Sequence, residues 1–180
     1  MPNYFPTTPS AGVDLVNSWT PPTSSSNPNL TNVPPYNLGW EINFTDNTNG
    51  SGGMAVSVIA TGGAIAKYDF VGIDENFVAQ PLTKALALAG NRIGVASFYA
   101  FASGDYGFVA VQGHNINGNV LASCAKDVPL FVTSTAGSLD DAAESSTFLQ
   151  VHGVVAAVSV GTLATNTELL VAVPMRYNLV

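Results

Sequence analysis

Two stretches of this chain have similar sequences, and their spacing constrains the fold more than any other feature. "AIAKYDFVGID" at residues 64–74 resembles "SCAKDVPLFVT" at 123–133. Lys67 and Lys126, which occupy the same place in the two stretches, are 59 residues apart. Such an internal repeat indicates two copies of one supersecondary unit, and neither copy alone buries its apolar face.

A second pair of stretches repeats at the same spacing. "RIGVASFYAFASGDYGFVAV" at 92–111 resembles "VHGVVAAVSVGTLATNTELLVAV" at 151–173, and the loop of the second hairpin is longer. Gly94 and Gly153 in these stretches are again 59 residues apart. Each half therefore contains a turn, a strand, a variable connector, another strand, a polar hairpin turn and a final apolar strand.

The repeat predicts an all-β fold. Pairing Asp69 with Asp127 gives a spacing of 58 instead of 59, which indicates a one-residue slip near the turn. Two similar halves that share one core form either a compact, pseudo-duplicated β-barrel or a sandwich. We expect the halves to span about 54–113 and 122–175.

Residues 1–40 differ in composition from the rest of the chain. They hold eight of the 11 prolines and one charged residue, Asp14. Proline fixes φ, lacks an N–H and favours extended backbone before it, so we expect an extended, proline-rich N-terminal arm before a β-domain at 41–180. A disordered tail is the alternative. Many large apolar residues favour an arm that binds a neighbouring protein, and the expected interface residues are Tyr4, Phe5, Trp19, Tyr36 and Trp40.

The charge pattern excludes several classes of partner. Only 9% of the residues are charged, the net charge is −7, and no two of the five Lys and Arg residues are adjacent. Phosphate binding needs clustered cations, so we expect no nucleic acid or anionic membrane as the main partner. The start resembles no secretory signal, and no run approaches the length of a membrane span. Such a low charge is typical of a protein within a larger assembly, and also of an extracellular β-protein rich in Ser, Thr and Asn.

Nucleophiles and bases occur only as isolated residues. Catalysis by a hydrolase needs a nucleophile held by a base, and His114, His152, Ser123 and Cys124 lie in no such motif. We expect His114 in a loop, Cys124 as a small buried apolar residue, and His152 within a strand at the position equivalent to Ile93. No phosphate-binding or dinucleotide motif is present, and the chain is not predicted to be an enzyme.

Acidic residues give no metal site by sequence. Asp46 is the only acid of the turn-rich "DNTNGSGG", which lacks the regular oxygen ligands of a calcium loop. Asp140, Asp141 and Glu144 stand among Ser and Ala, which predicts a solvated loop or a short helical turn. We therefore expect no metal and no cofactor. Residues 80–91 fit either a short helix or a loop followed by a strand, and we favour one short helical turn.

The order of these motifs resembles a known family. "GGAIAKYDFVGID", "NRIGVASFYAFASGDYGFVAVQG", "ASCAKDVPLFVTSTAGSL" and "VHGVVAAVSVGTLATNTELLVAV" together look like tailed-phage capsid decoration proteins, also called cement proteins. In that family an Ala-rich lead with "GD" precedes a strand, and an "hGVA" strand is followed by a polar turn and an apolar strand, twice. The resemblance covers roughly residues 54–175. This chain has "YD" and "KD" where members often have "GD", and the proline-rich arm is not a constant family feature.

The resemblance implies a structural role. Decoration proteins are compact β-proteins, frequently trimeric, that bind the outside of an icosahedral shell. We therefore expect a homotrimer on the outer capsid surface of a virion, with the major capsid protein as partner. The alternative is a carbohydrate- or receptor-binding β-domain of a virion or cell surface. Its ligand platform would consist of the aromatic residues of one hairpin, Tyr99, Phe101 and Tyr106.

Overall fold

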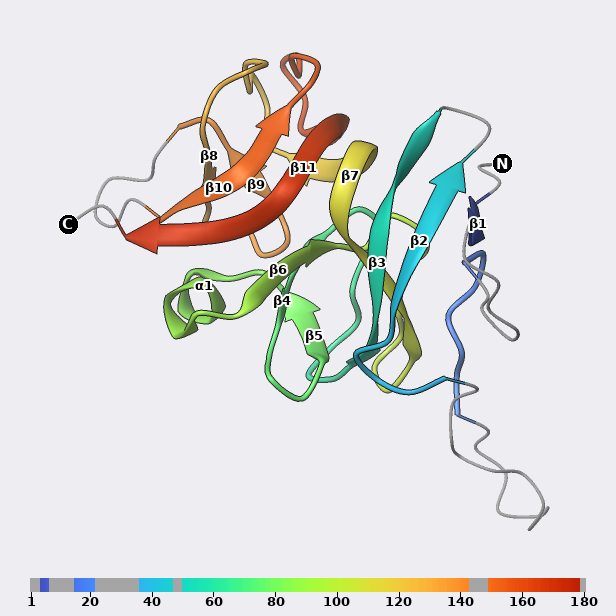
Figure 1. Ribbon diagram of the computed structural model, residues 1–180. Helices are drawn as coiled ribbons and strands as arrows, with labels where there is room; N and C mark the ends of the chain where they lie inside the picture. The colour runs from blue at the N-terminus through green and yellow to red at the C-terminus, as the bar shows by residue number, and fades with distance from the viewer. Residues whose placement is uncertain (1–3, 7–14, 22–35, 47–49, 143–148, 179–180) are drawn as a thin grey trace, which may run out of the picture.

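The computed structural model describes residues 4–6, 15–21, 36–46, 50–142 and 149–178. Within these ranges the chain is almost entirely β-structure, which confirms the predicted all-β fold (Figure 1). A single sheet contains every strand, in the order β1-β2-β3-β5-β4-β6-β7-β11-β10-β8-β9. The elements are β1 (Tyr4–Pro6), β2 (Glu41–Asp46), β3 (Ser51–Ala60), β4 (Phe70–Ile73), β5 (Val78–Pro81), α1 (Lys84–Ala89), β6 (Arg92–Val95), β7 (Tyr106–Val120), β8 (Leu130–Val132), β9 (Leu139–Asp140), β10 (Leu149–Ala156) and β11 (Thr165–Asn178).

Five strands of the first half close into a barrel. β3 pairs in parallel with β5, and β5, β4, β6 and β7 then follow as antiparallel neighbours. β7 returns to β3 by a long antiparallel ladder that runs from Ile59↔Tyr106 to Gly52↔His114 and closes the barrel. All four residues of β4 are buried, as expected for a strand packed on both faces.

The second half repeats this arrangement with the same strand directions. β7 pairs in parallel with β9 at Val120↔Leu139, and β9, β8, β10 and β11 follow as antiparallel neighbours. β11 then pairs antiparallel with the second part of β7, from Thr165↔Val120 to Val171↔Gly113. Figure 1 shows this second circuit above the first, with β7 passing from one to the other.

Backbone hydrogen bonds repeat at the spacing found in the sequence. Ile65 pairs with Phe101, and Cys124 accepts from Val160, with each partner 59 residues further along. Tyr68 N donates to Ala96 O, and Asp127 N donates to Ala156 O. Tyr68 and Asp127 both have positive φ, of 76° and 59°. The fold is therefore a pseudo-duplicated β-barrel, in which Asp127 is the structural counterpart of Tyr68.

Strand β7 serves both halves because it bends at glycine. Gly113 has φ +151°, and it lies where β7 leaves its ladder with β3 and begins its ladder with β11. A Cβ at Gly113 would lie 2.9 Å from the Cα of Gly53 on β3. Two backbones approach this closely only where both residues lack side chains.

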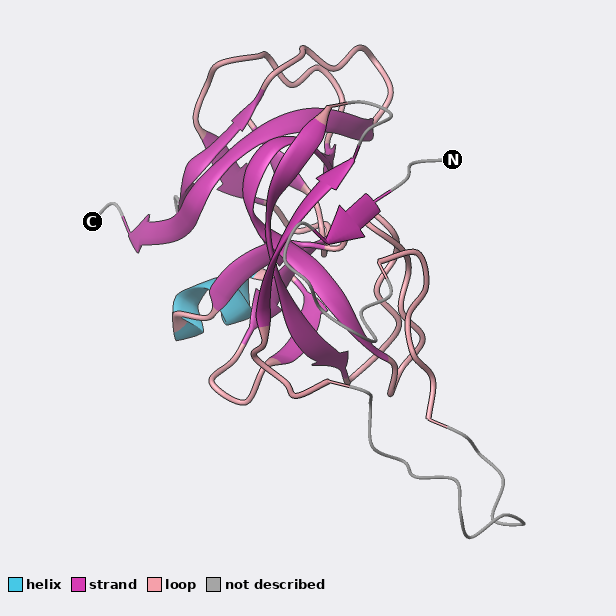
Figure 2. Ribbon diagram, turned by 45° about the vertical axis from the view of Figure 1, so that its right-hand side comes forward, coloured by secondary structure: helices cyan, strands magenta, loops and turns pink. Residues whose placement is uncertain are grey.

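Local sequence explains the short connections. Asp74 Oδ1 accepts from the N–H groups of Asn76 and Val78, at 2.9 and 2.8 Å, and so forms the turn between β4 and β5. Thr83 caps the N-terminus of α1, and Gly90, at φ +87°, caps its C-terminus. The expected short helical turn within 80–91 is confirmed. Figure 2 shows this helix outside the curved strands.

The core includes side chains from the N-terminal residues. Leu15 and Tyr36 are 2% and 7% exposed, and the Tyr36 ring lies 4.8 Å from that of Phe108 on β7. The core thus extends on both sides of the predicted boundary between residues 40 and 41. Most of the predicted arm, including residues 7–14 and 22–35, lies outside the described residues.

Residues 15–21 form a segment that we call the docked segment, because it pairs with the start of β7. The backbone N–H and C=O of Trp19 bond to Tyr106, at 2.7 and 2.8 Å. The side chains of Ser18 and Thr20 donate to the carboxylate of Asp105, at 2.8 and 2.7 Å. The docked segment therefore belongs structurally to the first barrel.

Candidate interaction surfaces and polar sites

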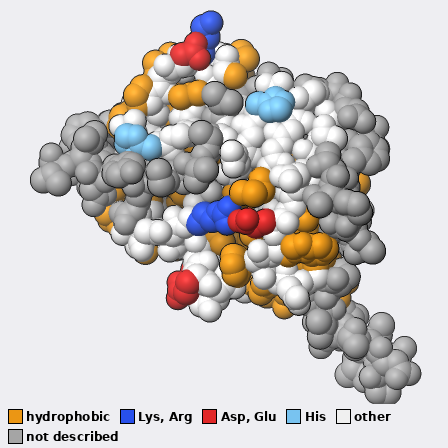
Figure 3. Space-filling model, viewed as in Figure 1, with side chains coloured by type: hydrophobic (Ala, Val, Ile, Leu, Met, Phe, Trp, Pro, Cys, Tyr) orange, Lys and Arg blue, Asp and Glu red, His pale blue; other side chains and the backbone are white. Residues whose placement is uncertain are grey.

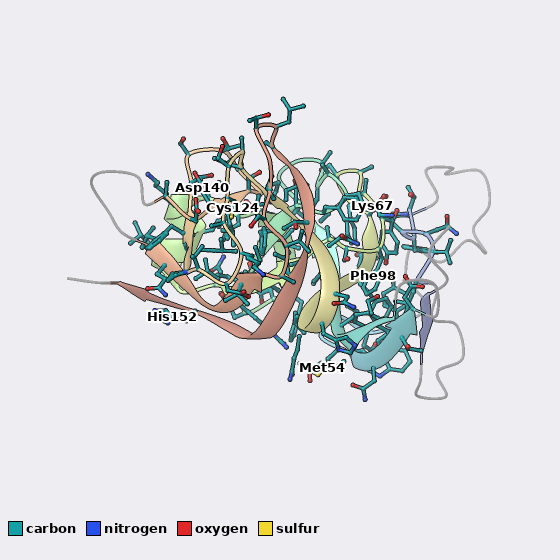
Figure 4. All side chains as sticks on the ribbon, turned by 90° about the horizontal axis from the view of Figure 1, so that it is seen from above. Met54, Lys67, Phe98, Cys124, Asp140 and His152 are labelled. Atoms are coloured by element: carbon teal, nitrogen blue, oxygen red, sulfur yellow. The ribbon has the colours of Figure 1, made fainter. Side chains whose placement is uncertain are left out.

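One cluster brings together groups that commonly bind metals. Ligand atoms of Cys124, Asp140 and Asp141 lie within 4.8 Å of one another, and no other such trio occurs in the described part of the chain. In Figure 4 Cys124 and Asp140 lie side by side, whereas His152 lies apart from them. The carboxylates already have backbone partners: Asp141 Oδ2 accepts from Ala125 N at 2.7 Å, and Asp140 Oδ1 accepts from Asp141 N at 2.8 Å.

The Cys124 thiol is held in its neutral form. Burial away from water, helped by the nearby negative charge of Asp141, raises the pKa of Cys124 to about 11. Burial also raises the pKa of the Asp140 carboxyl. A protonated thiol is a weak nucleophile and a weak metal ligand, so this cysteine has the surroundings of a structural residue.

The first half has a counterpart to this cluster that contains no cysteine. Ala66 N donates to Asp69 Oδ2 at 2.9 Å, as its counterpart Ala125 donates to Asp141. Asp69 Oδ1 also accepts from Asn119 Nδ2 of β7 at 3.0 Å, and burial raises the pKa of Asp69. In both halves a carboxylate therefore satisfies the same backbone N–H, which explains the acidic residues without chemistry.

The sequence expectations for the polar residues have mixed outcomes. Asp140 lies in the two-residue strand β9, so the expected loop or helical turn is wrong at that residue, and Glu144 lies outside the described residues. His114 lies in β7, which contradicts the expected loop, and its Nε2 is 3.0 Å from Gly50 O. His152 lies in β10 and Cys124 is buried, as expected.

The expected interface residues lie in different surroundings. Tyr4 and Phe5 form β1, which pairs with β2, but their side chains lie outside the described residues. Trp19 packs edge to face on Tyr106, with 5.5 Å between ring centroids. Tyr36 is buried in the chain's own core, so its side chain is not available to a neighbour. Trp40 is 36% exposed and remains accessible.

The aromatic platform of the carbohydrate-binding alternative is wrong. Tyr99 and Phe101 are 7% and 2% exposed, and their rings pack 5.0 Å apart within the core. Tyr99 Oη accepts from Phe108 N at 2.6 Å. Alternation along a strand does not reveal that a second layer covers its outer face, and here β2 and Tyr36 supply that layer.

Apolar side chains form the most distinctive described surface. Large exposed apolar residues occur on the docked segment, before β2, on α1 and in the loop between β10 and β11: Val16, Trp40, Leu88, Val158 and Leu163. Figure 3 shows hydrophobic side chains on the visible surface with few charged groups among them. The sequence gave one signal for the last two residues, the longer and uncharged loop of the second hairpin.

Comparison with known proteins finds no match among protein-family models, curated proteins or solved structures. The resemblance to decoration proteins is therefore still a prediction from short motifs. In the described residues, no helix has the length and apolar character needed to span a bilayer.

Proposed function

We propose that this protein is a non-enzymatic capsid decoration protein, which binds the outer surface of an icosahedral phage head as a homotrimer. The observation that carries the proposal is the combination of a closed β-core with large apolar side chains on its surface. Val16 and Leu163 are 60% and 79% exposed in a chain with only 9% charged residues. Exposed apolar groups of this kind are typical of surfaces that bind other proteins.

The described polar groups support a structural role. The carboxylates of Asp69, Asp105 and Asp141 all accept from backbone N–H groups of their own chain. Cys124 is buried and protonated. The motif order of the two halves adds the resemblance to decoration proteins, and trimeric binding would multiply weak contacts through a high effective concentration.

The region before β2 is the proposed contact with the shell. Trp40 is accessible there, and β1 and the docked segment bring the N-terminal residues to the same half of the molecule (Figure 1). An aromatic anchor in a desolvated pocket commonly contributes about 2 kcal/mol to binding. Tyr36 is not part of this contact because it is buried.

The test is co-sedimentation with heads assembled from the major capsid protein encoded in the same genome. We expect stoichiometric binding, which Trp40→Ala weakens by roughly 30-fold, the equivalent of about 2 kcal/mol. Leu88→Ala is the control, since Leu88 lies on α1, away from this region. Absence of co-sedimentation, together with binding to a glycan array, would instead support the carbohydrate-binding alternative.

A further inference from the structure

The loop that joins β10 to β11 exposes more apolar surface than its surroundings explain. Val158 and Leu163, at its two ends, are 51% and 79% exposed. The loop lies at the top of the second barrel in Figure 1, at the opposite end of the molecule from the start of β2. In Figure 3 hydrophobic side chains surround one positive and one negative group at this end.

The equivalent loop of the first half is covered. Hydrogen bonding makes Val160 the counterpart of Phe101, so Val158 corresponds to Tyr99 in the connection between β6 and β7. Tyr99 is buried, and its neighbour Phe98 packs edge to face on Phe44 of β2 at 4.9 Å. The first half therefore has a covering layer from its own chain, whereas Val158 remains open in the second half.

Charge favours a second copy of this chain as the partner. With a net charge of −7, two copies repel each other except where their surfaces carry little charge. Between Glu144 and Glu168 the sequence has no Asp, Glu, Lys or Arg. The exposed charges next to the loop are Lys126 and Asp127, which are adjacent and opposite in sign.

A hollow beside the loop has a suitable size for an apolar side chain. It has a volume of about 230 Å³ and is lined by Asn119, Val120, Ser138 and Ala164. Ala164 directly follows Leu163, so the projecting side chain and the hollow belong to one surface. A surface with both features can bind a copy of itself, and a ring closes when each copy binds the next.

We propose that this loop is the contact between copies of the chain, with Leu163 of one copy entering the hollow beside Ala164 of the next. The inference specifies the homotrimer of the proposed function, and it is tested in solution without capsids. A negative result for self-association is thereby distinguishable from a failure to bind shells.

The first experiment is sedimentation of the full chain and of two matched variants. We expect the wild type to be oligomeric and Leu163→Asp to be monomeric, with an unchanged circular dichroism spectrum and melting temperature. Leu88→Asp places the same charge on another exposed leucine, and we expect it to remain oligomeric. A monomeric wild type at the highest soluble concentration would overturn the proposal, as would an oligomeric Leu163→Asp or a monomeric Leu88→Asp.

The second experiment locates the contact. A tagged Leu163→Cys chain is mixed with an untagged Ser138→Cys chain under mild oxidation, both in a Cys124→Ala background. We expect a disulfide-linked band that contains both chains, because residue 163 of one copy reaches the hollow of the other. Linkage no greater than that of a tagged Leu88→Cys chain with the same partner would contradict this contact.

Discussion

Asp105 holds the docked segment against the first barrel, so its replacement by alanine tests whether residues 15–21 are part of the folded unit. Its side chain is 3% exposed and accepts from Ser18, Thr20 and the backbone N–H of Ala102, at 2.8, 2.7 and 2.9 Å. Asp105→Ala removes all three bonds and leaves the Ala102 N–H without this acceptor.

The expected cost is a substantial part of the total stability. Hydrogen bonds to a charged group contribute about 1.5–3 kcal/mol each, but hydroxyl groups near the surface recover part of this by turning to water. We expect Asp105→Ala to lower the free energy of unfolding by about 3 kcal/mol, compared with a total of about 5–15 kcal/mol for a typical domain. Release of the segment would also expose Leu15, now 2% exposed, and the burial of a leucine contributes about 1.5–3 kcal/mol.

Urea unfolding followed by tryptophan fluorescence measures this change, because Trp19 lies on the docked segment and packs on Tyr106. Asp105→Asn keeps an acceptor oxygen and should cost less than Asp105→Ala. Glu75→Ala is the control for loss of an acidic residue, since Glu75 is exposed and should change stability by less than about 0.5 kcal/mol. An Asp105→Ala variant as stable as Glu75→Ala would refute the structural role of the docked segment.

Three further predictions concern other parts of the molecule. Gly113→Ala should destabilise the protein by more than about 2 kcal/mol in urea unfolding, because the new Cβ meets the backbone of β3 and the residue has positive φ; Gly161→Ala, where a Cβ meets nothing within 4 Å, is the control. Burial raises the pKa of Cys124 to about 11, so stability should fall as the pH rises from about 9 to about 11. Cys124→Ala should lack that fall, and an identical pH profile for both proteins would contradict it. Deleting residues 1–14, which keeps Leu15, should weaken binding to shells but leave the melting temperature nearly unchanged; equal shell binding by the full and shortened chains would remove these residues from the interface.

The repeat was visible in the sequence because short turns need particular residues. The lysines of the two "AK" turns are 59 residues apart, and the positive-φ residues after them, Tyr68 and Asp127, keep that spacing in the structure. Thr83 and Gly90 likewise marked the ends of α1. Local sequence therefore predicted the features that depend on local backbone geometry.

Strand β7 could not be recognised from local sequence in the same way. Its second part, "QGHNINGNV", contains Gly and Asn residues that are depleted in strands and typical of turns. These glycines are required by tertiary packing: a Cβ at Gly118 would lie 3.1 Å from the Phe70 ring, and Gly113 faces Gly53. Only the three-dimensional arrangement explains why a turn-like sequence is extended, and this is also why His114 was expected in a loop.

The predicted arm shows a similar limit. Proline content correctly excludes a helix from residues 1–40, but it does not reveal what the apolar side chains contact. Leu15 and Tyr36 fill the chain's own core, whereas Val16 and Trp40 remain exposed. Burial of this kind depends on residues distant in sequence, such as Phe108, which packs against Tyr36.

The two halves differ most in what covers their ends, and this difference gives them different roles. Stacked repeats need a covering element at each end, because the last unit otherwise leaves apolar surface in water. In the first half β2 and the docked segment provide it, through Phe44 on Phe98 and Trp19 on Tyr106. The second half has Val158 and Leu163 at the equivalent place, and the described residues of the chain do not cover them. Under the proposed self-association, another copy supplies the missing cover, and the region around Trp40 at the opposite end stays free for the shell.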